Sequence, residues 1–108
     1  MEALYRKRVE EVFSRLEKAL RDVDPDVVEC ELAQGTLTLT FADHSRCILS
    51  TQPSVEQIWL ALASRGTAYH FNYDAEKRSW WDDKGKGVEI FSFLMNYLKE
   101  MTGLSLSL

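Results

Sequence analysis

The sequence predicts an α+β fold, a two-layer α/β sandwich. In it, an N-terminal and a C-terminal helix pack on one face of an antiparallel sheet of six strands, within a range of five to seven. Near both ends of the chain, apolar residues recur every three or four positions, whereas the middle alternates apolar and polar residues in short runs. The chain has 108 residues, 45% of them hydrophobic and 28% charged, which is the composition of a compact globular protein. We therefore expect one domain over residues 1–108.

The two helices are predicted at the ends of the chain. The first covers Ala3–Arg21, where apolar residues keep a helical spacing, and Pro25 prevents its continuation. The second covers Val88–Met101 and ends before Gly103, a residue type that favours the position just after a helix. Each helix would present one apolar face, which a sheet can cover.

Short alternating segments between the helices predict the strands of the sheet. Their ranges are Val28–Leu32, Thr36–Phe41, Arg46–Ser50, Val55–Leu62, Thr67–Tyr73 and Ser79–Asp82. The first two form a hairpin around residues 33–35, and the first three form a meander. Because successive side chains of a strand point to opposite faces, one face would pack on the helices and the other would remain open.

Acidic residues are concentrated between Asp22 and Glu31. Five of the chain's 17 acidic residues fall in this segment, which contains no Lys or Arg, and the whole chain has a formal net charge of −4. Carboxylates packed this closely repel one another, and a hard cation or a basic partner surface relieves that repulsion. The alternative is an acidic face that only keeps the protein soluble.

Trp59 is predicted to stand on the open face of the sheet. If Ile58 and Leu60 face the helices, Gln57 and Trp59 must point the opposite way, beside the threonines of the second strand and His70. A large aromatic side chain on a polar face is a common anchor for a protein partner. Two alternatives remain open: Trp59 lies flat over its cross-strand neighbours and shields them, and His70 is an ordinary surface imidazole.

Several other classes of function are disfavoured. The sequence shows no Ser/His/Asp or Cys/His constellation, so we do not expect an enzyme, and it has no basic stripe that would bind nucleic acid. Apolar runs such as Ile58–Ala63 are far shorter than the ~20 residues of a membrane helix, and the N-terminus lacks a signal-peptide pattern. We therefore expect a soluble, cytoplasmic protein that does not bind membranes. Cys30 and Cys47 are interpreted as small apolar core residues.

Residues Ile48–Ala61 read ILSTQPSVEQIWLA and resemble the signature strand pair of the frataxin family, most closely of its bacterial members. The resemblance extends over essentially the whole chain. The acidic first helix and strand, the Gly35 hairpin, the Tyr69–Phe71 strand, the Trp80 strand and the closing helix follow the family's order. It implies a single frataxin-like domain over residues 1–108 that binds iron, takes part in iron–sulfur cluster assembly and needs no organic cofactor.

The resemblance also implies partners and site residues. It implies weak binding of Fe²⁺ and Fe³⁺ and contacts with the cysteine desulfurase and the iron–sulfur scaffold protein, as an iron donor or an iron-dependent regulator. It further implies a monomer and leaves open whether iron drives the formation of oligomers. Carried over to this sequence, the iron ligands would be Glu10, Glu17, Asp22, Asp24, Asp26, Glu29 and Glu31. The partner-binding residues would be Gln52, Gln57, Trp59 and His70. The residues themselves leave a second reading open, an acidic docking module for the desulfurase in which metal binding is incidental.

The chain departs from the family's pattern at five positions. Lys18 and Arg21 interrupt the acidic first helix, and Val27 stands where a carboxylate is frequent, so the acidic set is thinner than in close relatives. Ser50 and Thr51 replace an Asn and a basic residue that precede the signature glutamine. These two changes could weaken or alter the scaffold contact.

Overall fold

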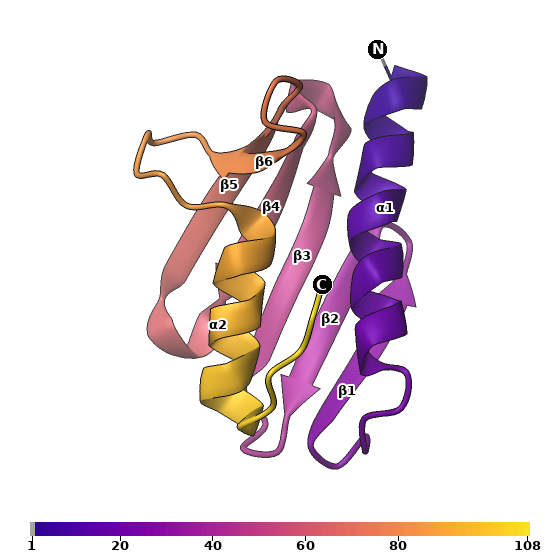
Figure 1. The fold of residues 1–108 in the computed structure, drawn as a ribbon, viewed down its shortest axis with the longest axis vertical. Coiled ribbons are helices and arrows are strands. Elements are labelled where there is room, and N and C mark those ends of the chain that lie inside the picture. Colours follow the sequence, from indigo (N-terminus) through magenta and orange to yellow (C-terminus); the bar gives the residue numbers. More distant parts are fainter. Residues whose placement is uncertain (1) are drawn as a thin grey trace.

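The computed structural model describes residues 2–108, which form two layers. The helices are α1 (Glu2–Leu20) and α2 (Ile90–Thr102). The strands are β1 (Val28–Ala33), β2 (Thr36–Phe41), β3 (Arg46–Gln52), β4 (Gln57–Leu62), β5 (Thr67–Asp74) and β6 (Ser79–Asp82). All six strands form one antiparallel sheet in the order β1 to β6, and both helices lie on one of its faces (Figure 1). The predicted α+β sandwich is confirmed.

One apolar core fills the space between the helices and the sheet. Leu39, Leu60 and Phe71 point from the sheet into this core and are fully buried, where they join Leu16 of α1 and Leu94 of α2. Burying a side chain of this size stabilises a fold by roughly 1.5–3 kcal/mol. Because strand side chains alternate, this packing fixes which residues of each strand remain on the open face.

The start of α2 differs from the prediction. The helix begins at Ile90 rather than Val88 because Glu89 adopts an extended conformation and caps it. Its carboxylate accepts hydrogen bonds from the backbone N–H groups of Phe91 at 3.0 Å and Ser92 at 2.9 Å. Burial raises the pKa of Glu89, but these bonds and one from a β6 hydroxyl outweigh burial and hold that pKa below its usual value.

The fourth strand starts later than predicted, whereas α2 closes at the predicted glycine. The fourth strand begins at Gln57 rather than Val55, because Pro53–Val55 forms a short 3-10 helix, η1, and Glu56 follows it with a φ of 52°. Proline has no backbone N–H and a fixed φ, so it does not continue the ladder of β3. At the other end of the chain, Gly103 closes α2 with a φ of 77°, as predicted.

The segment after Gly103 is a feature that the sequence analysis missed. It passes between α1 and α2 over the middle of the sheet (Figure 1). Leu106 and Leu108 pack against the core, and the Arg15 guanidinium donates a hydrogen bond to the backbone oxygen of Leu108 at 2.9 Å. The alternating Leu and Ser residues of 104–108 were the signal for a half-buried extended segment.

Candidate functional site

The seven carboxylates of the predicted metal set lie along one edge of the molecule, which we call the acidic edge. They are Glu10, Glu17, Asp22, Asp24, Asp26, Glu29 and Glu31, and all seven are exposed. Glu10 and Glu17 are two helical turns apart on the same flank of α1. The three aspartates lie in the connection to β1, where the Asp24 carboxylate accepts the Asp26 backbone N–H at 2.9 Å. The carboxylates thus follow α1, the connection and β1 in turn.

The register of β1 separates this set into two sides. Glu29 lies opposite Thr40 and Glu31 opposite Thr38, so both glutamates stand on the open face, away from the helix layer that carries Glu17. Among residues 2–108, no three His, Cys, Asp or Glu side chains lie close enough together to hold a metal ion. The convergence of ligands expected from the sequence is therefore not present as a formed cluster.

Two basic residues share the acidic edge. Lys18 and Arg21 line a groove of about 420 Å³ between α1 and β1, together with Glu17 and Glu29. Their positive charges oppose those of the carboxylates, so the departures noted in the sequence lie at the site itself. Cys30 lines the same groove. Burial, assisted by the charge of Glu17, raises its pKa to about 11, so the thiol is protonated at neutral pH.

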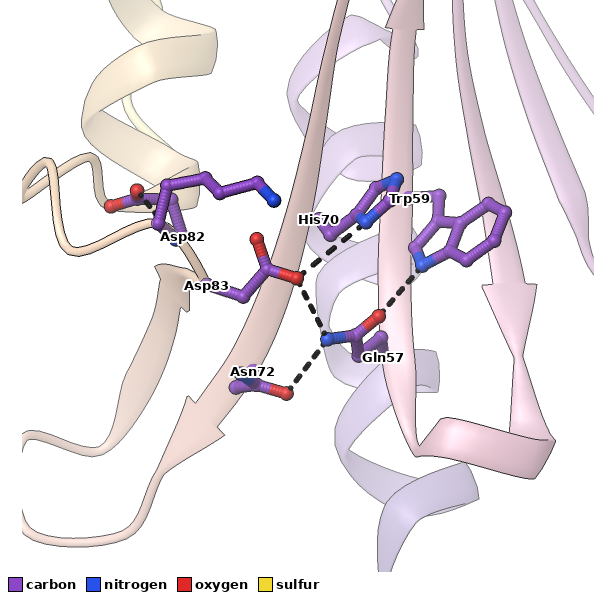
Figure 2. A network of polar contacts seen from close by, with 7 residues as sticks. Gln57, Trp59, His70, Asn72, Asp82 and Asp83 are labelled. Carbon is purple, nitrogen blue, oxygen red and sulfur yellow. Dashed lines mark hydrogen bonds and ion pairs between the residues drawn. The ribbon is translucent and has the colours of Figure 1, made fainter.

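A second group of residues lies on the open face of the sheet, centred on Trp59. Its indole ring stacks on the His70 imidazole, with ring centroids 4.2 Å apart and planes at 12°. The indole Nε1–H donates a hydrogen bond to the Gln57 side-chain oxygen at 2.8 Å (Figure 2). Trp59 nevertheless keeps 36% of its surface exposed. The ring therefore covers His70, as the shielding alternative predicts. It also keeps an exposed aromatic surface, as a partner anchor requires.

The neighbours of Trp59 differ in part from those predicted. On the β3 side it lies opposite Ser50, and on the β5 side opposite His70. The threonines of β2 were expected beside it, but β3 stands between β2 and β4 in the sheet. The error arose because the sequence predicts the face of each strand more directly than the order of the strands.

Asn72 and Asp83 complete this group, and neither was predicted as a site residue. The Gln57 amide donates hydrogen bonds to Asn72 Oδ1 at 3.1 Å and to Asp83 Oδ2 at 3.2 Å (Figure 2). The same Asp83 oxygen lies 3.5 Å from His70 Nδ1. Asn72 could have been found, since it is two residues from His70 and shares its face. Asp83 lies in a loop, where periodicity carries no information. We call Gln57, Trp59, His70, Asn72 and Asp83 the open-face cluster.

Asp82 holds the loop that places Asp83. Its carboxylate accepts backbone N–H groups from Lys86 at 2.9 Å, Val88 at 2.8 Å and Lys84 at 3.2 Å. These hydrogen bonds lower the pKa of Asp82, so the carboxylate remains charged in mildly acidic solution. The Asp83 backbone N–H then donates to the His70 carbonyl oxygen at 2.8 Å, which ties the loop to β5.

Gln52, the remaining predicted partner residue, lies at the end of β3 opposite Gln57. Its backbone N–H donates to the Tyr5 hydroxyl at 3.0 Å, and that hydroxyl donates to the Gln57 carbonyl oxygen at 2.6 Å. Tyr5 of α1 thus fixes the ends of β3 and β4 from the helix side. The structure places all four predicted partner residues, Gln52, Gln57, Trp59 and His70, on one face of neighbouring strands.

Comparisons with known proteins agree with this fold. A family model described as a frataxin-like domain matches residues 1–104. A relative from Paraburkholderia phymatum, named iron-sulfur cluster assembly protein CyaY, is 35% identical over 100 residues, which are 92% of this chain and 89% of that protein. A protein of the same name from Delftia acidovorans is 36% identical over 85 residues, which are 79% of this chain and 72% of that protein.

Solved structures match the fold over nearly the whole chain. Frataxin from Psychromonas ingrahamii gives a TM-score of 0.85 at 21% identity, over 98% of this chain and 95% of that chain. Trimeric frataxin from Saccharomyces cerevisiae, complexed with ferrous iron, gives a TM-score of 0.74 at 21% identity, over 90% of this chain and 87% of that chain. In the described part of this chain, residues 2–108, no helix is long and apolar enough to cross a membrane.

Proposed function

Because the chain belongs to the frataxin family, we propose that it is an iron-binding protein of iron–sulfur cluster assembly. It carries weakly held Fe²⁺ or Fe³⁺ on the acidic edge and modulates the cysteine desulfurase and scaffold complex, as an iron donor or an iron-dependent regulator. It acts without an organic cofactor and is not itself an enzyme. The observation that carries the proposal is the exposure of all seven carboxylates along one edge.

The chemistry of the acidic edge supports iron as a cargo. Carboxylate oxygens suit hard cations, and an exposed carboxylate can bind a metal ion that keeps much of its water. Such ligands bind weakly and discriminate poorly among hard cations. Weak binding suits a protein that must release its iron to a partner. Lys18 and Arg21 in the adjoining groove lower the negative potential, and therefore the affinity, further.

The open-face cluster supplies the second half of the proposal, the docking surface for the assembly complex. Trp59 is held by the stack on His70 and by the hydrogen bond to Gln57, so little side-chain freedom remains to be lost on binding. Tryptophan is also among the residues that most often dominate the energy of an interface. A preorganised, exposed indole beside amide and carboxylate groups is suited to a specific protein contact.

A second candidate function is a docking module in which the acidic edge binds Lys and Arg side chains of the desulfurase and metal binding is incidental. The spacing of the carboxylates favours it, because among residues 2–108 they form no cluster for a single ion, whereas each exposed carboxylate can pair with a Lys or Arg side chain of a partner. The two functions differ in their dependence on salt. Docking between exposed charges weakens steeply as ionic strength rises.

The test is a heteronuclear NMR titration with Fe²⁺ under anaerobic conditions at two ionic strengths. We expect paramagnetic broadening confined to residues 22–31 and the C-terminal end of α1. Reversing Asp22, Glu29 and Glu31 to Lys should abolish this broadening and desulfurase docking while leaving the fold intact. A matched variant, with Glu11, Glu76 and Glu100 reversed to Lys, changes the net charge equally and should keep both.

The outcomes separate the two functions. Broadening elsewhere in the molecule, or unchanged broadening in the Asp22, Glu29 and Glu31 variant, would contradict iron binding on the acidic edge. The docking module would be favoured by two results together: the wild type shows no localised iron broadening, and it docks on the desulfurase whereas the Asp22, Glu29 and Glu31 variant does not.

A further inference from the structure

The two edges of the sheet end differently. At the β6 edge, the strand is short and the chain closes its outer side, since Trp81 pairs with Glu89 and the Asp82 N–H donates to the Val88 carbonyl oxygen at 2.9 Å. At the other edge, β1 pairs with β2 and with no other strand of the described chain, residues 2–108. Figure 1 shows β1 as the outermost strand, with α1 above it on one face of the sheet. An unpaired strand edge is a template for another strand.

The hairpin register identifies the backbone groups that β1 leaves free. Gln34 and Gly35 form a two-residue turn with φ values of 51° and 76°, so Ala33 is hydrogen bonded to its partner across the turn. Alternation then directs the N–H and C=O groups of Cys30 and Leu32 away from β2. Within residues 2–108, no protein group takes up the outward N–H of either residue. Two donors and two acceptors in a row are therefore open to a partner.

A partly apolar groove lies beside Leu32, at one end of this row of groups. It has a volume of about 450 Å³ and lies between α1 and the β1–β2 hairpin, where Val9, Phe13 and Leu32 are among the residues that line it. Leu32 is 43% exposed, although it points to the core side of the sheet. A strand added to β1 would direct alternate side chains to the helix side of the sheet, where the one beside Leu32 enters this groove, and the others onto the open face. Apolar residues fit the groove positions.

Charge decides the residues that fit the open face. Glu29 and Glu31 flank the added strand there, and both are exposed, so Lys or Arg at the facing positions would pair with them across the strands. A second copy of this chain would instead set its own Glu29 and Glu31 beside these two, and like charges on paired strands are destabilising.

We propose that the β1 edge accepts an extended segment of a partner protein, with alternating apolar and basic residues, as a seventh strand of the sheet. The proposal rests on the proposed docking function for the origin of the segment. To that function the proposal adds the way in which the segment binds, as a strand, and the types of residue that the segment carries. Main-chain hydrogen bonds to Cys30 and Leu32 supply part of the affinity, and the groove and the two glutamates supply the selectivity.

The probe is a short capped peptide of alternating Lys and Leu residues, titrated into the wild-type protein and followed by NMR. Binding should slow hydrogen exchange at the amides of Cys30 and Leu32. Two further peptides carry N-methyl groups on every Leu or on every Lys. An antiparallel strand bonds through its Leu amides and a parallel strand through its Lys amides, so one of the two should bind about tenfold more weakly than the other.

Protein variants provide an independent test. Leu32→Pro removes an outward N–H without touching the β1–β2 ladder, and Leu32→Ala removes only the side chain. The proline variant should bind the parent peptide about tenfold more weakly than the alanine variant, with unchanged amide signals in β3–β5. If either variant failed to fold, the exchange rates and methylated peptides in the wild type would still decide.

Three results would overturn the strand mode: equal binding of both methylated peptides with no amide protection, no peptide binding at low salt, or peptide-free self-association through β1. Equal binding of both methylated peptides would mean that charge alone holds the peptide. Self-association would mean that a second copy of the chain occupies the β1 edge. If the peptide fails while reversal of Asp22, Glu29 and Glu31 still abolishes desulfurase docking, the docking function stands and only the strand mode is wrong.

Discussion

The open-face cluster and the acidic edge are polar surfaces of the same molecule, built in opposite ways. In the open-face cluster, Trp59, Gln57 and Asp83 are joined by side-chain hydrogen bonds of 2.8 and 3.2 Å, and a loop is fixed to hold one of them. Along the acidic edge, Glu29 and Glu31 stand on one side of β1 and Glu17 on the other. The side chains of the open-face cluster are therefore held in place in the free protein. The carboxylates of the acidic edge would be brought together only by a bound ion or partner.

This difference predicts different kinds of recognition. An organised surface loses little conformational entropy on binding, so it contributes affinity that is specific and insensitive to salt. Dispersed, exposed charges attract a partner over a distance and speed its association, but their effect decreases as salt screens them. We therefore expect the open-face cluster to determine which partner binds, and the acidic edge to determine how fast it binds and how iron affects it.

The largest expected effect comes from removing the indole. Trp59→Ala should weaken association with the desulfurase–scaffold complex by roughly 2–3 kcal/mol, the cost of losing a central aromatic anchor. The free energy of unfolding should fall by only about 1 kcal/mol, because the ring is partly exposed and stacks on one neighbour. Calorimetric binding and thermal unfolding measure the two quantities. Leu104→Ala, at a side chain 37% exposed on the helix side, is the matched control and should leave binding unchanged.

Salt separates the two surfaces, with a smaller effect. Raising ionic strength from about 50 to about 500 mM should weaken wild-type binding roughly tenfold through the acidic edge. A variant that neutralises the same carboxylates, with Asp22→Asn, Glu29→Gln and Glu31→Gln, should bind more weakly at low salt and lose this dependence. The ratio of Trp59→Ala to wild-type affinity should remain constant, because the indole contact carries no charge. A ratio that changed with salt would mean that the two surfaces are not independent.

Removal of Asp83 tests whether organisation itself contributes to binding. Asp83→Ala deletes one of the two acceptors of the Gln57 amide and the carboxylate beside His70, without touching Trp59. Losing one such hydrogen bond costs about 1 kcal/mol, so binding should weaken about fivefold, mainly through a more mobile indole. Tryptophan side-chain relaxation measured by NMR would show that mobility. Weaker binding with a rigid indole would instead mean that Asp83 contacts the partner directly.

The same contrast explains what could be predicted from the sequence. Alternation in Thr36–Phe41 predicted that strand with its observed bounds, because burial of one face forces that pattern. It also placed Gln57, Trp59 and His70 on one face. The sequence could not reveal Asp83, whose position depends on hydrogen bonds from a loop to Asp82. The density of acidic residues in the sequence predicted the acidic edge. It did not predict that the register of β1 places Glu29 and Glu31 on the face of the sheet opposite the helices.

The smallest expected effect uses Cys30 to report on the acidic edge. Burial and the charge of Glu17 raise the pKa of this thiol to about 11, so alkylation at neutral pH should be slow and should accelerate with pH until that value. Glu17→Gln removes a negative charge, which stabilises the thiolate, lowers this pKa and should speed alkylation roughly two- to threefold.

A divalent cation bound beside Glu17 should act in the same direction, because it neutralises the same charge. Ca²⁺ should therefore speed alkylation of Cys30 in the wild type but not in Glu17→Gln, as measured by mass spectrometry. Cys47 is the internal control, since it is fully buried, with a pKa of about 12, and should remain unmodified in every sample. Equal acceleration in both proteins would place the cation elsewhere along the acidic edge, and the carboxylates of β1 would then become its nearest ligands.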